Sequence, residues 1–214
     1  PMRQNGLETA VKKLAVHIPV WGICGGYQML GRTISDPHGV ENENSLCEPL
    51  YPAHCEAISH EPDTIAVERI KRDGALPLRG MELIDTDTTL MPEKMRTQTR
   101  GKFENVTGIF STLSGLEFSG YEIHMGNTTV PTGEHQTPLV QLADGRTDGV
   151  QRMEKGSEAP GVYGSYVHGI FDEGDIAVRI VQALADKKRV SWKPEAGGDY
   201  HAFKEQQYDK LAQG

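Results

Sequence analysis

The stretch that most constrains the fold is residues 20–30, VWGICGGYQML. Its apolar start is typical of a buried strand, the glycines around Cys24 permit a tight turn, and the residues from Tyr27 onward can begin a helix. The pattern therefore predicts a strand, a turn that contains a cysteine, and a helix in immediate succession.

The spacing of the glycines gives this cysteine a special position. Gly22 and Gly26 flank Cys24 as in a nucleophile elbow, a strained turn that lifts one side chain above the edge of a sheet. A helix that begins just after Cys24 would direct unpaired N–H groups at the sulfur and favour the thiolate. The Gly25 N–H would donate to an oxyanion formed when that sulfur attacks a carbonyl. A structural cysteine beside a glycine-rich turn is the alternative that the motif alone leaves open.

The composition narrows the class of protein. The chain of 214 residues is long enough for one domain with an insertion, and it has no apolar run that could cross a bilayer and no secretory segment near Pro1. A net charge of -8 argues against nucleic acid as the main partner. The three cysteines form no disulfide framework, which favours a reducing compartment, so we expect a cytoplasmic protein.

Outside the elbow, the pattern predicts alternating helices and strands. An amphipathic helix over residues 6–16 precedes the apolar residues 18–23, and a helix followed by a buried strand favours a parallel α/β sheet. After the elbow we expect a loop insertion over 41–79, strands within 80–126, a polar loop over 127–159 and a strand over 161–167. Two helices are expected after that strand. The first has Ile176, Ile180 and Leu184 as its apolar stripe, and the last runs through about Ala212 with Leu211 inward.

Three further side chains are candidates for chemistry. His168 ends the predicted strand over 161–167, and at the carboxyl end of a strand in a parallel α/β sheet it is a candidate general base. Glu122 and His124 share one strand face by period-two spacing and could line a polar pocket. From composition alone, a structural pair that holds a strand end is the simpler interpretation of these two residues.

Neither a metal site nor a nucleotide site is expected in this chain. Cys47, His54, Cys55 and His60 follow no zinc-binding spacing, so exposed loop residues are the better interpretation. The sequence also lacks a phosphate-binding loop of the G-x-x-x-x-G-K-[ST] type, which excludes ATP binding by that route.

Four motifs together resemble the glutaminase domain of cobyric acid synthase, a family of class I glutamine amidotransferases. They are residues 22–31 (GICGGYQMLG), 36–40 (DPHGV), 120–126 (GYEIHMG) and 166–172 (YVHGIFD). The likeness runs in order through residues 20–186, which makes it more specific than any single motif. It implies a flavodoxin-like α/β domain with a mostly parallel central sheet.

The resemblance also implies an activity and a set of partners. The activity is hydrolysis of L-glutamine to supply ammonia for ATP-dependent amidation of carboxylates on a corrinoid, adenosylcobyrinic acid a,c-diamide, in cobalamin synthesis. On the matching positions, Cys24 is the nucleophile and His168 the catalytic histidine, Gly25 supplies an oxyanion donor, and Glu122 and His124 belong to the active-site wall. ATP and Mg²⁺ are expected in a separate N-terminal synthetase domain, and no nucleic acid or membrane partner is expected.

Two departures from the family pattern matter. Most class I amidotransferases have His-x-Glu, but position 170 is Ile, so a carbonyl, another side chain such as Glu122, or a neighbouring domain must orient the imidazole. The family's first strands, one oxyanion loop and the synthetase domain have no counterpart in this sequence. We therefore expect a partial C-terminal domain with weak or no glutaminase activity alone, because losing one oxyanion donor typically slows such a reaction about a hundredfold or more.

Two alternatives stay open at this point. The glutaminase subunit of lipid II isoglutaminyl synthase has a similar elbow and histidine, although residues 120–126 favour the corrinoid family. A non-catalytic interaction domain that retains the fold is the other alternative.

Overall fold

The elbow predicted from the glycines forms where a strand meets a helix. Strand β1 (Val20–Ile23) ends just before Cys24, and helix α2 (Gly25–Leu30) begins just after it. Helix α1 (Leu7–Ala15) precedes β1, as its apolar spacing predicts. The computed structural model describes residues 5–40, 77–131, 135–153, 160–172, 175–193 and 200–212.

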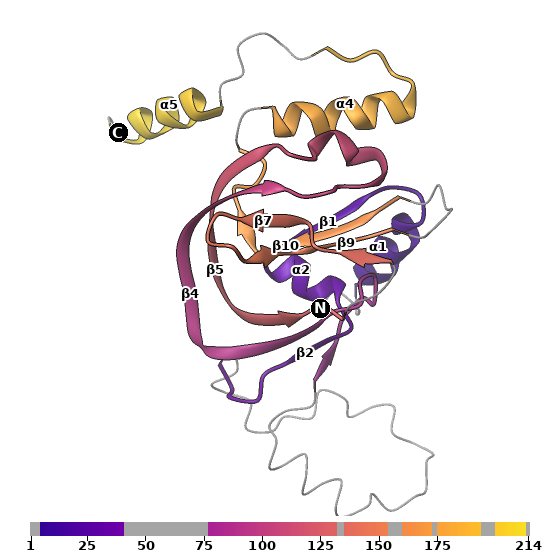
Figure 1. Cartoon of the computed structure of the whole chain (residues 1–214), viewed down its shortest axis with the longest axis vertical. Helices are drawn as coiled ribbons and strands as arrows, with labels where there is room; N and C mark the ends of the chain where they lie inside the picture. The colour runs from indigo at the N-terminus through magenta and orange to yellow at the C-terminus, as the bar shows by residue number, and fades with distance from the viewer. Residues whose placement is uncertain are drawn as a thin grey trace, which may run out of the picture.

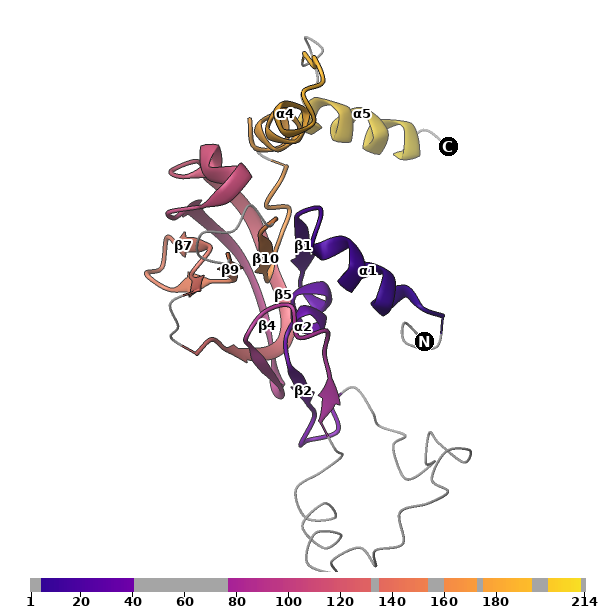
Figure 2. The same ribbon diagram turned by 90° about the vertical axis from the view of Figure 1, so that its right-hand side faces the viewer.

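The first of two sheets contains β1. Its order in the described residues is β1, β10 (Val162–Ser165), β9 (Val150–Arg152) and β6 (Gln136–Thr137). β1 and β10 run parallel, whereas β9 is antiparallel to both of its neighbours. Figure 2 shows α1 and α2 on one side of these strands. A Cβ at Gly164 would lie 2.1 Å from the Tyr27 ring, so glycine is needed there for α2 to approach β10.

The second sheet is built on a long antiparallel hairpin that curves along one side of the molecule (Figure 1). Its strands are β4 (Asp87–Phe103) and β5 (Glu117–Thr129), joined through the 3₁₀ helix η1 (Gly108–Leu113). β11 (Val167–His168) pairs antiparallel with β5, and β2 (Thr33–Ser35) pairs parallel with β4. The remaining strands of this sheet are β3 (Leu78–Arg79), β7 (Val140–Leu142) and β8 (Thr147–Asp148).

Two apolar clusters hold the sheets and helices together. The larger one joins β4, β5 and η1 to helix α4 (Ile176–Lys188), with Phe103, Leu113 and Ile176 fully buried. The smaller one surrounds α2 and includes Tyr27, Leu30 and Tyr166, and Cys24 packs against its edge. The turn that holds Cys24 is therefore fixed by packing behind it.

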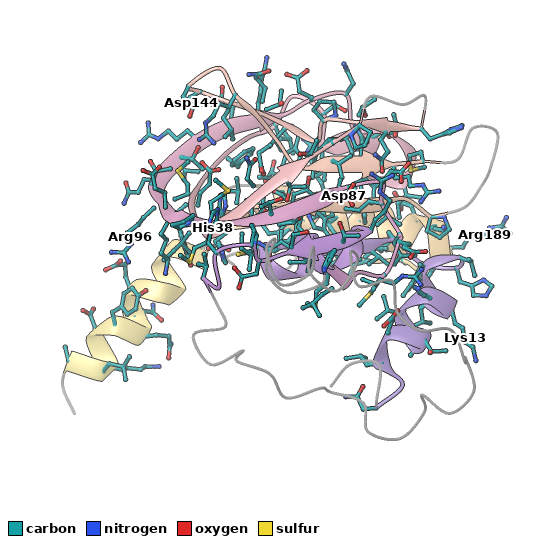
Figure 3. The ribbon with its side chains drawn as sticks, turned by 90° about the horizontal axis from the view of Figure 1, so that it is seen from below. Lys13, His38, Asp87, Arg96, Asp144 and Arg189 are labelled. Carbon is teal, nitrogen blue, oxygen red and sulfur yellow. The ribbon has the colours of Figure 1, made fainter. Side chains whose placement is uncertain are left out.

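Many charged side chains lie on the surface of the molecule. Exposed charged side chains such as Lys13, Arg96, Asp144 and Arg189 project away from the ribbon (Figure 3). None of the helices in the described ranges combines the length and the apolar character that a membrane crossing requires.

Several expectations from the sequence need correction. The sheets are mixed: β1–β10 and β2–β4 are parallel, and the other described pairs are antiparallel, so a mostly parallel sheet is not confirmed. Residues 127–159 hold four short strands, β6 to β9, rather than only a polar loop. Most of the expected insertion over 41–79 lies outside the described residues, but Leu78–Arg79 forms β3 against β2. Helix α5 (Tyr200–Ala212) forms, yet Leu211 is 78% exposed instead of inward.

Candidate functional site

Cys24 occupies a strained backbone conformation. Its φ of 52° and ψ of -112° lie in a region that residues with a Cβ rarely adopt, at a cost of order 1–3 kcal/mol. A Cβ at Gly22 would lie 2.7 Å from the backbone of Gly26, so only glycine lets the helix start this close to β1. Gly25 is exposed, and apart from its chain neighbours and the backbone of its own helix no described heavy atom lies within 4 Å of where its Cβ would be. The strain and the open space beside Gly25 fit the elbow predicted from sequence.

The sulfur of Cys24 faces the backbone of β5. The Cys24 N–H donates to the Ser165 carbonyl at 2.9 Å, which ties the turn to the end of β10. The thiol is half-buried, and its Sγ lies 3.6 Å from the Ile123 carbonyl oxygen, in a geometry where S–H donates. Ile123 stands between the two other candidates on β5, so the structure brings Cys24 next to the Glu122–His124 segment.

His168 lies on the segment that follows β10. His168 is three positions after Ser165, so their Cα atoms are at most about 11 Å apart. Because Ser165 accepts the hydrogen bond from Cys24, the thiol and the imidazole come from adjoining segments. Its ring stacks on Tyr121 of β5, with centroids 5.0 Å apart and planes 5° from parallel. Its Nε2 atom is buried and has no hydrogen-bond partner among the described residues. Ile170, at the position of the usual carboxylate, is buried in the larger apolar cluster.

Glu122 and His124 lie on the opposite face of β5 from the Tyr121–His168 stack, because successive side chains alternate between faces. Glu122 accepts two hydrogen bonds from the Arg146 guanidinium, at 3.2 and 2.7 Å. Its other close neighbour is His124, whose Nε2 lies 3.6 Å away. The carboxylate that the sequence suggested as a support for His168 is thus engaged elsewhere.

Burial and neighbouring charges set the pKa of the Glu122 carboxyl group. Burial raises the pKa of Glu122, but His124 and Arg146 outweigh burial and lower that pKa from 4.5 to about 2. The same contact with Glu122 raises the pKa of Arg146. Burial raises the pKa of nearby Asp148, which accepts hydrogen bonds from Ser165 Oγ and the Tyr166 N–H. Glu122 therefore stays ionised at any pH where the protein works.

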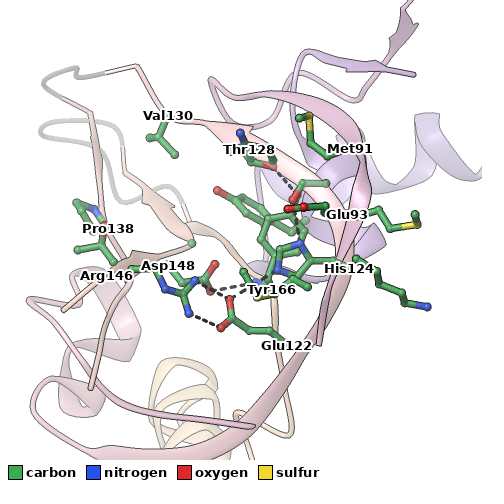
Figure 4. A pocket seen from close by; sticks show the side chains of 18 of the residues that line it. Met91, Glu93, Glu122, His124, Thr128, Val130, Pro138, Arg146, Asp148 and Tyr166 are labelled. Carbon is green, nitrogen blue, oxygen red and sulfur yellow. Dashed lines mark hydrogen bonds and ion pairs between the residues drawn. The ribbon is translucent and has the colours of Figure 1, made fainter. Parts of the chain in front are cut away.

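These residues form the floor of a cavity of about 880 Å³ (Figure 4). The His124 ring stacks on Tyr166 at 3.7 Å, and the Tyr166 hydroxyl lies 2.6 Å from Thr128 Oγ1. The His124 Nδ1 is 2.8 Å from the Gly126 carbonyl, to which it donates, and Nε2 makes no hydrogen bond in the described structure but lies 3.6 Å from Glu122 Oε1. The rim is largely apolar and includes Met91, Met95, Val130, Pro131 and Pro138.

The sequence did not identify Arg146 as part of this site. It lies between β7 and β8, in the stretch read as a polar loop, and the Asp144-Gly145 dipeptide before it is the turn signal that could have marked a hairpin there. Cys47, His54, Cys55 and His60 lie outside the described residues.

Comparisons with known proteins agree with the motifs. The family model described as a CobB/CobQ-like glutamine amidotransferase domain matches residues 2–51 and 63–176. Over 99% of this chain, the sequence is 37% identical to a cobyric acid synthase of Ruminiclostridium cellulolyticum, 32% to one of Lachnoclostridium phytofermentans and 34% to one of Bacteroides fragilis. The matches cover 35%, 36% and 33% of those proteins, so the chain spans about a third of the length of these relatives.

Proposed function

Because the chain belongs to the CobB/CobQ-like glutamine amidotransferase family, we propose that it hydrolyses L-glutamine and supplies the ammonia for amidation of a corrinoid carboxylate. The observation that supports this most is Cys24 in its strained turn between β1 and α2. Strain at a reactive side chain is typical of a functional site rather than of a structural cysteine.

We propose roles for the residues around the thiol. His168 takes the proton of Cys24, and the sulfur attacks the side-chain amide carbon of glutamine. The Gly25 N–H stabilises the resulting oxyanion. The intermediate collapses to a γ-glutamyl thioester as His168 passes the proton to the leaving nitrogen, which departs as ammonia. Water activated by His168 then hydrolyses the thioester, releasing glutamate and restoring the thiol.

We also propose that the cavity over Glu122 and His124 receives the amino-acid end of glutamine. Arg146 is 44% exposed, and besides the N–H groups bound to Glu122 and Asp144 its guanidinium has others that could bind a carboxylate. His124 Nε2, which lies 3.6 Å from Glu122 Oε1, offers a second polar contact. Glu122 and His124 line this cavity and flank Ile123 on β5, and the Ile123 carbonyl oxygen lies 3.6 Å from Cys24 Sγ. These features support Glu122 and His124 as part of the active-site wall.

The other partners belong to this proposal as well. The named relatives are synthases about three times as long as this chain, which supports an ATP-dependent synthetase domain as its partner. ATP and Mg²⁺ would be held in that domain. We propose that the reaction takes place on a flavodoxin-like core around β1 and β10, in the cytoplasm, where the few cysteines of this chain would stay reduced.

Glutamate release from L-glutamine, measured with the synthetase partner present, tests the proposal. Cys24→Ala and His168→Ala should each lower kcat about a thousandfold or more, because they remove the nucleophile or its base. His17→Ala, at an exposed histidine, is the matched control and should leave kcat unchanged. Turnover that survives in Cys24→Ala would favour a non-catalytic interaction domain.

A further inference from the structure

The His168 ring is fixed neither by the glutamate of a His-x-Glu pair nor by Glu122, and its Nε2 has no hydrogen-bond partner in the part of the chain that the structure describes. Ile170 occupies the position of the usual glutamate, and Glu122 is bound to Arg146 on the other face of β5. A general base needs one ring orientation, because only then does its nitrogen meet the reacting proton. We propose that Tyr121 is the positioning residue for His168, holding the imidazole by stacking; this inference rests on the proposed function.

The contact has the geometry of a specific aromatic pair. The ring planes are 5° from parallel with centroids 5.0 Å apart, which is an offset stack rather than a face-to-face sandwich. The two residues are directly opposite each other in the antiparallel pairing of β5 with β11. Cross-strand partners on one face lie close enough for their side chains to interact.

Gly120 brings the two strands unusually close at this point. A Cβ on Gly120 would lie 2.3 Å from the His168 carbonyl oxygen and 2.8 Å from Val167 Cγ1. Any other residue would therefore push β11 away from β5 and separate the imidazole from the phenol ring. Gly120 thus allows β11 to approach β5, and Tyr121 provides the ring against which His168 stacks.

Packing of the core does not require the Tyr121 ring. Tyr121 is 49% exposed, whereas Glu122, the next residue on β5, and Val167, which lies opposite Glu122 on β11, are buried. A half-exposed aromatic on a strand contributes little to the core, so its stacked contact with His168 is its main described interaction. A stacked aromatic pair populates the stacked ring orientation several-fold to about tenfold more than other orientations. Loss of the Tyr121 ring should therefore lower kcat by a factor of the same size.

The test compares Tyr121→Leu, which removes the ring, with Tyr121→Phe, which keeps it. Glutamine hydrolysis is measured with the synthetase partner present, and Tyr208→Leu, at a 55% exposed tyrosine of α5, is the matched control. Tyr121→Leu should lower kcat by several-fold to about tenfold with KM nearly unchanged, and Tyr121→Phe should restore the wild-type rate. Unchanged kcat in Tyr121→Leu, or no rescue by Phe, would overturn the inference.

Nuclear magnetic resonance of the chain gives a readout independent of turnover. The His168 ring protons of the wild type should show the upfield shift caused by a stacked phenol ring, with cross-relaxation to Tyr121. Tyr121→Leu should abolish the shift and Tyr121→Phe should keep it. Wild-type spectra without the shift would refute the stack even if the leucine variant failed to fold.

Failure of the proposed glutaminase function and failure of the proposed role of Tyr121 would give different results. If His168→Ala leaves hydrolysis intact, the proposed function fails and this inference fails with it. If His168→Ala abolishes hydrolysis while Tyr121→Leu behaves like Tyr208→Leu, only the role of Tyr121 is overturned.

Discussion

The buried carboxylate of Glu122 makes a measurable contribution to stability, which Glu122→Gln should remove. The difference between the ordinary pKa of 4.5 and about 2 in the folded protein corresponds to about 3 kcal/mol at neutral pH. Gln keeps the shape of the side chain but removes the negative charge that faces Arg146, which keeps its ion pair with Asp144. Because Arg146 is 44% exposed and water compensates in part, we expect the free energy of unfolding to fall by about 2–3 kcal/mol.

The stability difference between wild type and Glu122→Gln should shrink as the pH falls. A carboxyl group whose folded pKa is lowered contributes its full stabilisation above the unfolded value of 4.5, and loses that stabilisation as the pH falls toward about 2. Urea unfolding should therefore separate wild type and Glu122→Gln at pH 7 and bring them together near pH 2. Glu117→Gln, at an exposed position of the same strand, is the control and should change stability by less than about 0.5 kcal/mol. A wild-type advantage that is absent at pH 7, or equally large at both pH values, would refute the reasoning.

Three further substitutions test the packing around the site. Gly22→Ala should lower stability by about 1–3 kcal/mol in thermal unfolding, because its Cβ would lie 2.7 Å from the Gly26 backbone and force α2 away from β1; an unchanged midpoint would contradict this. Tyr166→Phe should cost about 1–2 kcal/mol in urea unfolding, since it removes the hydroxyl that meets Thr128 at 2.6 Å, and a loss under about 0.3 kcal/mol would count against that bond. Leu211→Ser should change stability by less than about 0.5 kcal/mol because the side chain is 78% exposed, and a larger loss would mean that α5 is packed.

Local chemistry made part of the site predictable. The elbow follows from Gly22, Cys24 and Gly26, because the absence of Cβ atoms within a few residues decides whether the turn can form. Helix α1 follows from apolar spacing in the same way. The position of His168 at the end of a strand was predicted from the apolar run over 161–167, which forms β10 and the first residue of β11 with a break at Tyr166.

The missed features depend on contacts between distant segments. Arg146 and Glu122 are 24 positions apart, and only the folding of the β7–β8 hairpin over β5 brings them together. β6 to β9 are two or three residues long, so they carry no period-two signal and exist because their partners pair with them. The Tyr121–His168 stack likewise depends on the register of β5 with β11, which no local pattern specifies.

Covalent capture of the nucleophile tests most directly whether Cys24 attacks glutamine. The chain is incubated with a glutamine analogue that carries an electrophilic diazoketone in place of the amide, and the adduct is mapped by peptide mass spectrometry. We expect a single adduct on Cys24, suppressed by excess L-glutamine and absent in Cys24→Ala. Modification of Cys47 or Cys55 in its place, or labelling that glutamine does not suppress, would contradict it.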